Sequence, residues 1–116
     1  MEVVEKKKEE LKEMDGNKDQ IRYRVHPDIY KSINHAEKEV DVEVALPGVK
    51  KENIILKALP TWFKLSATRN SVEFAANTSF GIEVIPDKTT AEYSNGLLKI
   101  HAVVKDPLDS AVEVEL

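Results

Sequence analysis

Short runs in which apolar and polar residues alternate dominate the sequence from residue 21 onward. The clearest run is VDVEVAL at residues 40–46, where every second side chain is apolar. A period of two is typical of a β-strand with one buried and one solvent-exposed face, because successive side chains of a strand point to opposite sides. No stretch after residue 20 has the pattern of a long helix, so the sequence predicts an all-β domain.

Turn-forming residues separate these runs at short intervals. Alternation predicts further strands within residues 53–59, 63–68, 72–76, 80–84, 89–93 and 98–102, and residues 26–30 suit an edge strand that tolerates a proline. Proline or glycine ends several of them, and Ser94-Asn95-Gly96 is a strong hairpin signal. Many short strands with turn signals every ~8–12 residues predict an antiparallel β-sandwich or barrel.

The two ends of the chain differ from this alternating region. Residues 5–13 (EKKKEELKE) are almost all charged, so residues 1–20 are expected to be an arm, either frayed and solvated or a short helix that docks on a partner. Residues 105–110 resemble a linker, and VEVEL at 112–116 alternates again. Because five residues cannot form a sheet alone, we expect this tail to add to an exposed sheet edge of its own domain or of a neighbouring chain. The chain thus divides into an arm (1–20), a sandwich (21–104) and a C-terminal extension (105–116).

Composition argues against several classes of protein. The 116 residues are enough for one domain, and the formal net charge of −4 makes a nucleic-acid partner a poor expectation, because such binding depends on neutralising phosphates. No apolar run approaches the ~18 residues that span a bilayer, so no membrane partner is expected. The chain has no cysteine, and its first residues lack the apolar core of a signal peptide. These features favour a cytoplasmic protein.

No group of residues has the spacing of a catalytic or cofactor site. The four glycines lie far apart, so there is no phosphate-binding loop. His26, His35 and His101 lack metal-ligand spacing, and His101 is expected on the solvent face of its strand. Asp41 and Glu43 share the solvent face of one strand, which favours solubility charges over an acid–base pair. We therefore expect no catalytic residue, no metal and no cofactor.

Three stretches, in order, resemble the α-crystallin domain of small heat-shock proteins. Residues 41–54 (DVEVALPGVKKENI) have that family's strand, Leu-Pro-Gly-Val, charged pair and following Ile. Residues 63–69 (FKLSATR) are similar to its strand that ends in a small residue, a polar residue and Arg, and residues 91–98 (AEYSNGLL) fit its signature A-x-x-x-N-G-x-L. The resemblance covers residues 27–104 and implies an immunoglobulin-like antiparallel β-sandwich. Its signature residues here are Leu46, Pro47, Gly48, Ala91, Gly96 and Leu98.

Local physical chemistry agrees with this signature. Gly96 after Asn95 would supply the positive φ angles of a tight hairpin. Leu98 would then point into the core, and Ala91 would be small where its strand packs closely.

The resemblance also implies an activity. Small heat-shock proteins are ATP-independent holdase chaperones, which bind unfolding client proteins, prevent their aggregation and catalyse nothing. In that family a short apolar motif after the domain inserts into a groove of a neighbouring subunit. The corresponding docking residues here are Val112, Val114 and Leu116, and the groove would lie between edge strands that carry Ile54 and Leu56 on one side and Thr90 and Ala91 on the other.

Two features differ from the family pattern and leave the assembly open. The N-terminal arm is short and charged where the family's arm is usually longer and more apolar. Residues 70–79 are too few for the long loop through which microbial members exchange a strand to form dimers. We expect self-association as a dimer or a larger assembly. The same departures also fit a second class, a CS-domain-like co-chaperone or protein-binding module with one specific partner.

Overall fold

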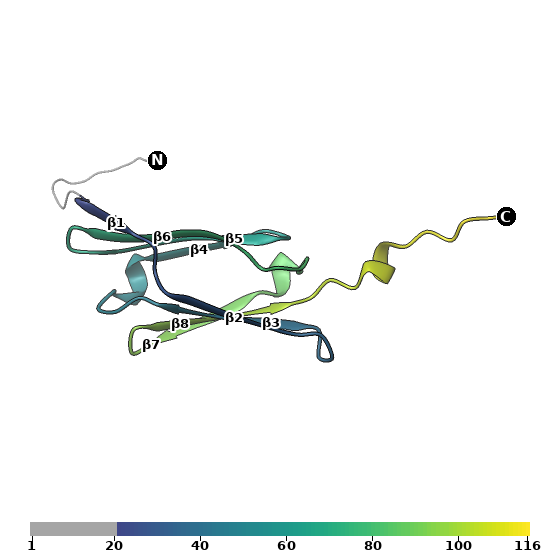
Figure 1. The fold of residues 1–116 in the computed structure, drawn as a ribbon, viewed down its shortest axis with the longest axis horizontal. Coiled ribbons are helices and arrows are strands. Elements are labelled where there is room, and N and C mark those ends of the chain that lie inside the picture. The colour runs from purple at the N-terminus through teal and green to yellow at the C-terminus, as the bar shows by residue number, and fades with distance from the viewer. Residues whose placement is uncertain (1–20) are drawn as a thin grey trace.

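The computed structural model describes residues 21–116, so the expected helix or frayed tail within residues 1–20 lies outside the described residues. Two four-stranded sheets pack face to face, with strand orders β1-β6-β5-β4 and β2-β3-β8-β7 (Figure 1). The strands are β1 Tyr23–Val25, β2 Ile29–Asn34, β3 Glu39–Ala45, β4 Ile54–Ala58, β5 Trp62–Arg69, β6 Val72–Ser79, β7 Thr90–Ser94 and β8 Leu97–Val103, and short 3-10 turns occur at η2 Lys51–Asn53, η3 Pro86–Lys88 and η4 Pro107–Ser110. The predicted all-β sandwich is confirmed. Within residues 21–116, no helix is long and apolar enough to cross a membrane.

The alternation in the sequence becomes an alternation in burial. Along β3, Val42 and Val44 are at most 1% exposed, whereas Asp41 and Glu43 lie on the outer face. Each buried valine pairs with a buried residue of the neighbouring strand β8, Val42 with Ile100 and Val44 with Leu98. Burial of such a side chain contributes roughly 1.5–3 kcal/mol, so these inward-facing rows hold the two sheets together. Leu98 points into the core as the sequence predicts.

The β7–β8 hairpin has the turn that its sequence demands. Asn95 and Gly96 have φ angles of 52° and 78°, which are the left-handed conformations of a two-residue turn whose twist matches the strands it joins. A side chain at Gly96 would also meet the backbone, because a Cβ built there lies 3.3 Å from the Cα of Pro47. The expected role of Gly96 is therefore confirmed, and the turn abuts the Leu46–Pro47 corner.

Three expected strands differ from those observed. The strand predicted at 72–76 continues to Ser79, because Asn77, Thr78 and Ser79 go on pairing with β5. The prediction of a strand at 80–84 is wrong: this segment crosses from one sheet to the other, and its β-pairing is limited to an isolated bridge between Val84 and Val104. A glycine with a φ of 84° turns the chain there, at Gly81. The edge strand expected at 26–30 begins only at Ile29 and runs to Asn34.

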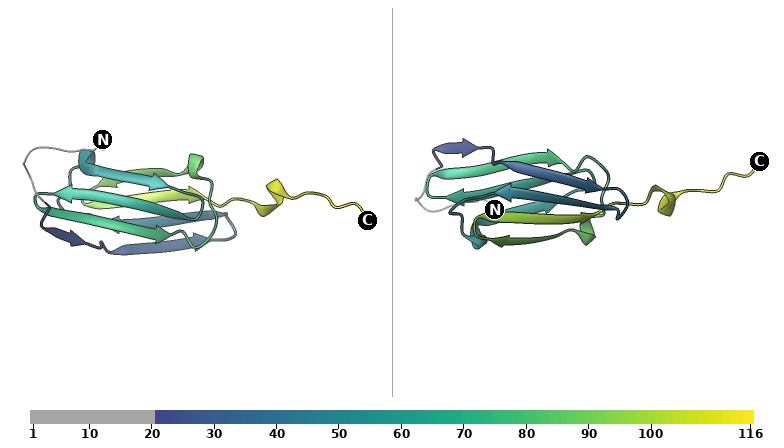
Figure 2. Two further views of the ribbon diagram at one scale, coloured as in Figure 1. Left: turned by 90° about the horizontal axis from the view of Figure 1, so that it is seen from above. Right: turned by 60° about the horizontal axis from the view of Figure 1, so that its bottom comes forward.

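The order of the strands places β4 and β7 on the same flank of the sandwich. β1 and β2 are edge strands of different sheets, yet only residues 26–28 join them, so both border one flank. β4 and β7 stand at the opposite ends of the two strand orders and must border the other flank. The view from above shows this arrangement, with β1 and β2 along one side and β4 and β7 along the other (Figure 2). Among the described strands, β1 and β6 form the one parallel pair.

Candidate binding surfaces

The flank bordered by β4 and β7 carries partly covered apolar side chains. Ile54 and Leu56 of β4 are half-buried and pack against the core. Ala91 and Tyr93 of β7 face the space between the sheets, because their partners in β8, Ile100 and Leu98, are buried. We call these four residues and Ala58, also half-buried on β4, the β4–β7 flank.

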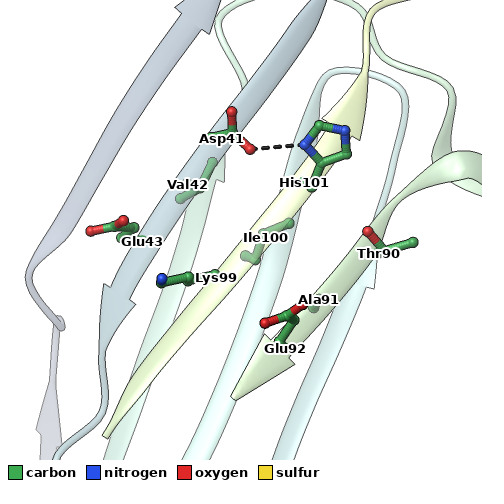
Figure 3. Close-up of a pocket in the computed structure, with 9 residues that line it drawn as sticks. All are labelled: Asp41, Val42, Glu43, Thr90, Ala91, Glu92, Lys99, Ile100 and His101. Atoms are coloured by element: carbon green, nitrogen blue, oxygen red, sulfur yellow. Dashed lines mark hydrogen bonds and ion pairs between the residues drawn. The ribbon is translucent and has the colours of Figure 1, made fainter. Parts of the chain in front are cut away.

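Two residues of the expected groove lie differently from what the sequence suggests. Thr90 pairs with His101 and therefore points to the outer face of its sheet, away from the flank (Figure 3). Ala91 was expected where its strand packs closely, but this residue is exposed. Among the strands of residues 21–116, β7 is an edge strand, so none of them lies on its far side to cover Ala91. The structure thus brings Ile54, Leu56 and Ala91 to the inner sides of the two strands and leaves Thr90 outside.

The C-terminal tail lies away from this flank. After η4 the chain extends from the sandwich without pairing to any strand (Figures 1 and 2). Val112 and Val114 are 83% and 77% exposed, and Leu116 is fully exposed. Within the part of the chain that the structure describes, the apolar tail residues are therefore not covered by their own domain.

Tyr93 joins the β4–β7 flank to the corner that follows β3. Its hydroxyl oxygen lies 2.8 Å from the carbonyl oxygen of Leu46 and 2.6 Å from that of Val49, so the two carbonyls share its one donated proton. Those carbonyls belong to the Leu-Pro-Gly-Val segment, so the hydroxyl fixes the corner against β7. No role for Tyr93 was predicted from the sequence. The available signal was a tyrosine at an inward position of a predicted strand, because a half-buried tyrosine hydroxyl usually has a hydrogen-bond partner.

A cluster of one histidine and two carboxylates lies on the outer face of the β2-β3-β8-β7 sheet. The His101 Nδ1 atom is 2.8 Å from Asp41 Oδ1 on the adjacent strand β3 (Figure 3), and Nε2 is 3.9 Å from Glu39 Oε2. The hydrogen bond with Asp41 raises the pKa of His101, with the charges of both carboxylates adding to it and partial burial opposing it.

The geometry of this cluster suits an imidazolium ion better than a metal ion. Ligand atoms of Glu39, Asp41 and His101 lie within 4.8 Å of one another, so the residue types alone would allow a cation. However, the two carboxylates face different ring nitrogens, and the Asp41 contact is a direct hydrogen bond. The predicted solvent-face position of His101 is confirmed, with its side chain 40% exposed.

We expect His101→Gln to lower the melting temperature at pH 5.5 more than at pH 8.5. Because the folded-state pKa is raised, the stabilisation is fully present below the ordinary value of 6.5 and is lost as pH rises through the raised value. The effect is at most about 1 kcal/mol, because the pair is exposed and screened by solvent. Thermal unfolding at both pH values measures it. His35→Gln, in the exposed turn before β3, is the control, and an equal loss at both pH values would contradict the expectation.

A second polar surface lies where β4 begins and β5 ends. Lys50, Asn53, Thr68, Arg69 and Asn70 line a hollow together with Gly48, and we call it the basic hollow. The hollow borders the β4–β7 flank, because Asn53 directly precedes Ile54 in the chain. This hollow was not predicted from the sequence.

The fold of this chain is similar to that of known proteins, although its sequence matches none of the family models. No protein-family model matches the chain, and no curated protein matches it. Solved structures do match. Heat shock protein 16.0 from Schizosaccharomyces pombe shares 20% identity with a TM-score of 0.62, covering 79% of this chain and 98% of that one. HSP18.5 from E. histolytica shares 16% identity with a TM-score of 0.61, covering 78% and 98% respectively.

The third example is a small heat-shock protein from Xylella fastidiosa, with 13% identity and a TM-score of 0.60, which covers 78% of this chain and 94% of that one. The chain has the fold of the small heat-shock proteins. The resemblance drawn from the three sequence motifs is thus confirmed at the level of the fold. In this small heat-shock protein fold, the β5–β6 connection is only Asn70 and Ser71, so the chain has no long loop at that point.

Proposed function

We propose that this chain is an ATP-independent holdase chaperone that binds unfolding proteins and prevents their aggregation. The observation that carries the proposal is the pair of complementary apolar surfaces in a small heat-shock protein fold: an exposed valine tail and a partly covered β4–β7 flank on the same chain. Extended apolar segments that add to an open sheet edge gain both backbone hydrogen bonds and side-chain burial. Unfolding clients present segments of this kind.

Self-association through the tail is part of the proposal. Val112 and Val114 are two residues apart, so in an extended tail they point the same way, as Ile54 and Leu56 do along β4. The tail stands clear of its own sandwich, which leaves it available to the β4–β7 flank of a second copy (Figure 1). We propose that assembly and client binding share this flank. The activity is binding alone, with no catalytic step, and its proposed location is the cytoplasm.

The test is suppression of client aggregation by the full chain. Model clients unfolded by heat or by reduction should stay in solution without ATP when the chain is present at a few copies per client, as measured by light scattering. An unrelated small β-sandwich protein at the same concentration is the control. Failure to suppress aggregation at large molar excess would refute the proposal.

One observation favours the second candidate, a binding module with a specific partner. The two-residue β5–β6 connection removes the strand-exchange loop that the resemblance would use for dimers. A CS-domain-like co-chaperone needs no such loop. That function would be indicated by a tight one-to-one complex with a single protein, together with no rescue of general clients.

A further inference from the structure

We infer that Lys50 and Arg69 receive a carboxylate from the acidic tail of a second copy, and thereby fix the direction in which that tail docks along β4. This inference rests on the tail-mediated self-association proposed above. It adds the chemistry that selects this tail and the direction in which it runs. Four observations support it.

The first observation is that the Arg69 side chain lies against Gly48. A Cβ built on Gly48 would lie 2.8 Å from both Cδ and Nη1 of Arg69, so the arginine side chain packs directly over this glycine. Gly48 has a φ of 77°, a conformation that favours glycine for a second reason. The guanidinium lines the basic hollow together with Lys50. A guanidinium can hold a carboxylate with two parallel hydrogen bonds.

The second observation is that these cations have no acidic partner among residues 21–116. The lysine and arginine ion pairs in that range involve Arg24, Lys38 and Lys105. Lys50 and Arg69 take part in none of them. The other side chains that line the hollow are neutral and polar, so the hollow as a whole presents positive charge and hydrogen-bond donors.

The third observation is the opposite charge of the tail. After Lys105 the sequence contains four acidic residues and no basic one. Asp106 is already used, because it accepts a hydrogen bond from the Leu108 backbone and contacts Lys38 at 3.4 Å. Glu113 and Glu115 are exposed and flank the valines of the docking motif. The tail thus combines the apolar residues that suit the flank with the anions that suit the hollow.

The fourth observation is the position of the hollow relative to β4, which selects one direction. If the tail runs antiparallel to β4 with Val112 beside Leu56 and Val114 beside Ile54, its next residue, Glu115, comes level with Asn53 at the hollow. If the tail runs parallel, Glu115 instead passes toward Lys57 and lies far from the hollow, because strands advance about 3.3 Å per residue. Lys57 and Lys64 also have no acidic partner among residues 21–116, so unpaired cations alone would not select a direction. The hollow adds a guanidinium, which can hold a carboxylate with two hydrogen bonds, and the polar side chains of Asn53, Thr68 and Asn70, and these favour the antiparallel arrangement.

Charge reversal in the full chain tests this inference. The double variant Lys50→Glu/Arg69→Glu should weaken assembly about tenfold, as should Glu113→Lys/Glu115→Lys, because each replaces an attraction across the contact with a repulsion. The chain that carries all four changes should recover most of the wild-type assembly. Light scattering over a range of protein concentrations gives the mass and the apparent dissociation constant. The tail variant is independent of folding effects, because its residues lie outside the sandwich.

A matched control separates direction from net charge. Lys57→Glu/Lys64→Glu reverses two cations that pair across β4 and β5, with the same change in net charge. This control should leave assembly within about twofold of wild type, because in the antiparallel arrangement Lys57 comes level with the uncharged Ala111. Weakening by this control rather than by the Lys50/Arg69 variant would overturn the inference in favour of a parallel tail.

The proposed function and the inference can fail separately. If Val112→Gly/Val114→Gly lowers the mass while every charge variant leaves it unchanged, the tail docks but the basic hollow does not receive it, and the inference is overturned alone. If the valine variant also leaves the mass unchanged, tail-mediated self-association fails and the inference fails with it. Recovery in the fourfold variant is the result that supports the inference.

Discussion

The double variant Val112→Gly/Val114→Gly should reduce the solution mass of the assembled protein to that of its smallest unit. Burial of a valine contributes ~1.5–3 kcal/mol, so losing both side chains removes roughly 3–6 kcal/mol from each tail contact. That loss corresponds to docking about 10²–10⁴-fold weaker, enough to dissociate assemblies at micromolar concentration. The sandwich itself should be unaffected, because both valines are more than three-quarters exposed and have no role in the core.

Light scattering at low and high protein concentration measures this effect directly. Glycine also makes the tail more flexible, so Ser110→Gly/Ala111→Gly is the matched control: it places two glycines in the same extension and keeps the valines and the charge. The control should retain the wild-type mass. A valine variant with unchanged mass, or a wild-type chain that stays at 13.1 kDa at all concentrations, would contradict docking by the tail.

Most strands could be predicted because their signal is local. In β3, β5 and β8 the buried side chains are apolar and most of the outward side chains are polar. A period of two therefore identifies both the strand and its buried face. The Asn95-Gly96 turn is equally local, since its positive φ angles depend on these two residues. Residues 80–84 show where the same rule fails. Phe80 and Val84 are buried as alternation predicts, but they cover the end of the core from a crossing segment.

The structural features that could not be predicted from the sequence depend on contacts between segments far apart in the chain. The parallel pairing of β1 with β6 joins Tyr23 to Val72, and no pattern within either segment indicates it. The contact of Arg69 with Gly48 creates the basic hollow only after β5 and the corner beyond β3 come together. The side to which Thr90 points was also missed, because a shift of one residue in register turns a side chain to the opposite face.

Phe63→Ala should destabilise the sandwich by about 3–5 kcal/mol, the usual loss when a buried phenylalanine leaves a cavity. Phe63 is fully buried, and its ring centroid lies 5.3 Å from that of Phe80, so truncation removes both apolar burial and an aromatic contact. Domains of this kind are stable by only ~5–15 kcal/mol, so a substantial fraction of molecules would unfold under mild stress.

Urea unfolding in the Val112→Gly/Val114→Gly background measures the loss without a contribution from assembly, which would make stability depend on concentration. Tyr30→Ala is the control: it also truncates an aromatic residue, but Tyr30 is 75% exposed on β2, and its loss should stay near ~0.5 kcal/mol. Equal losses at the two sites would mean that Phe63 does not anchor the core. A large loss at Phe63 alone would show that this buried ring, which packs against Phe80, anchors the core.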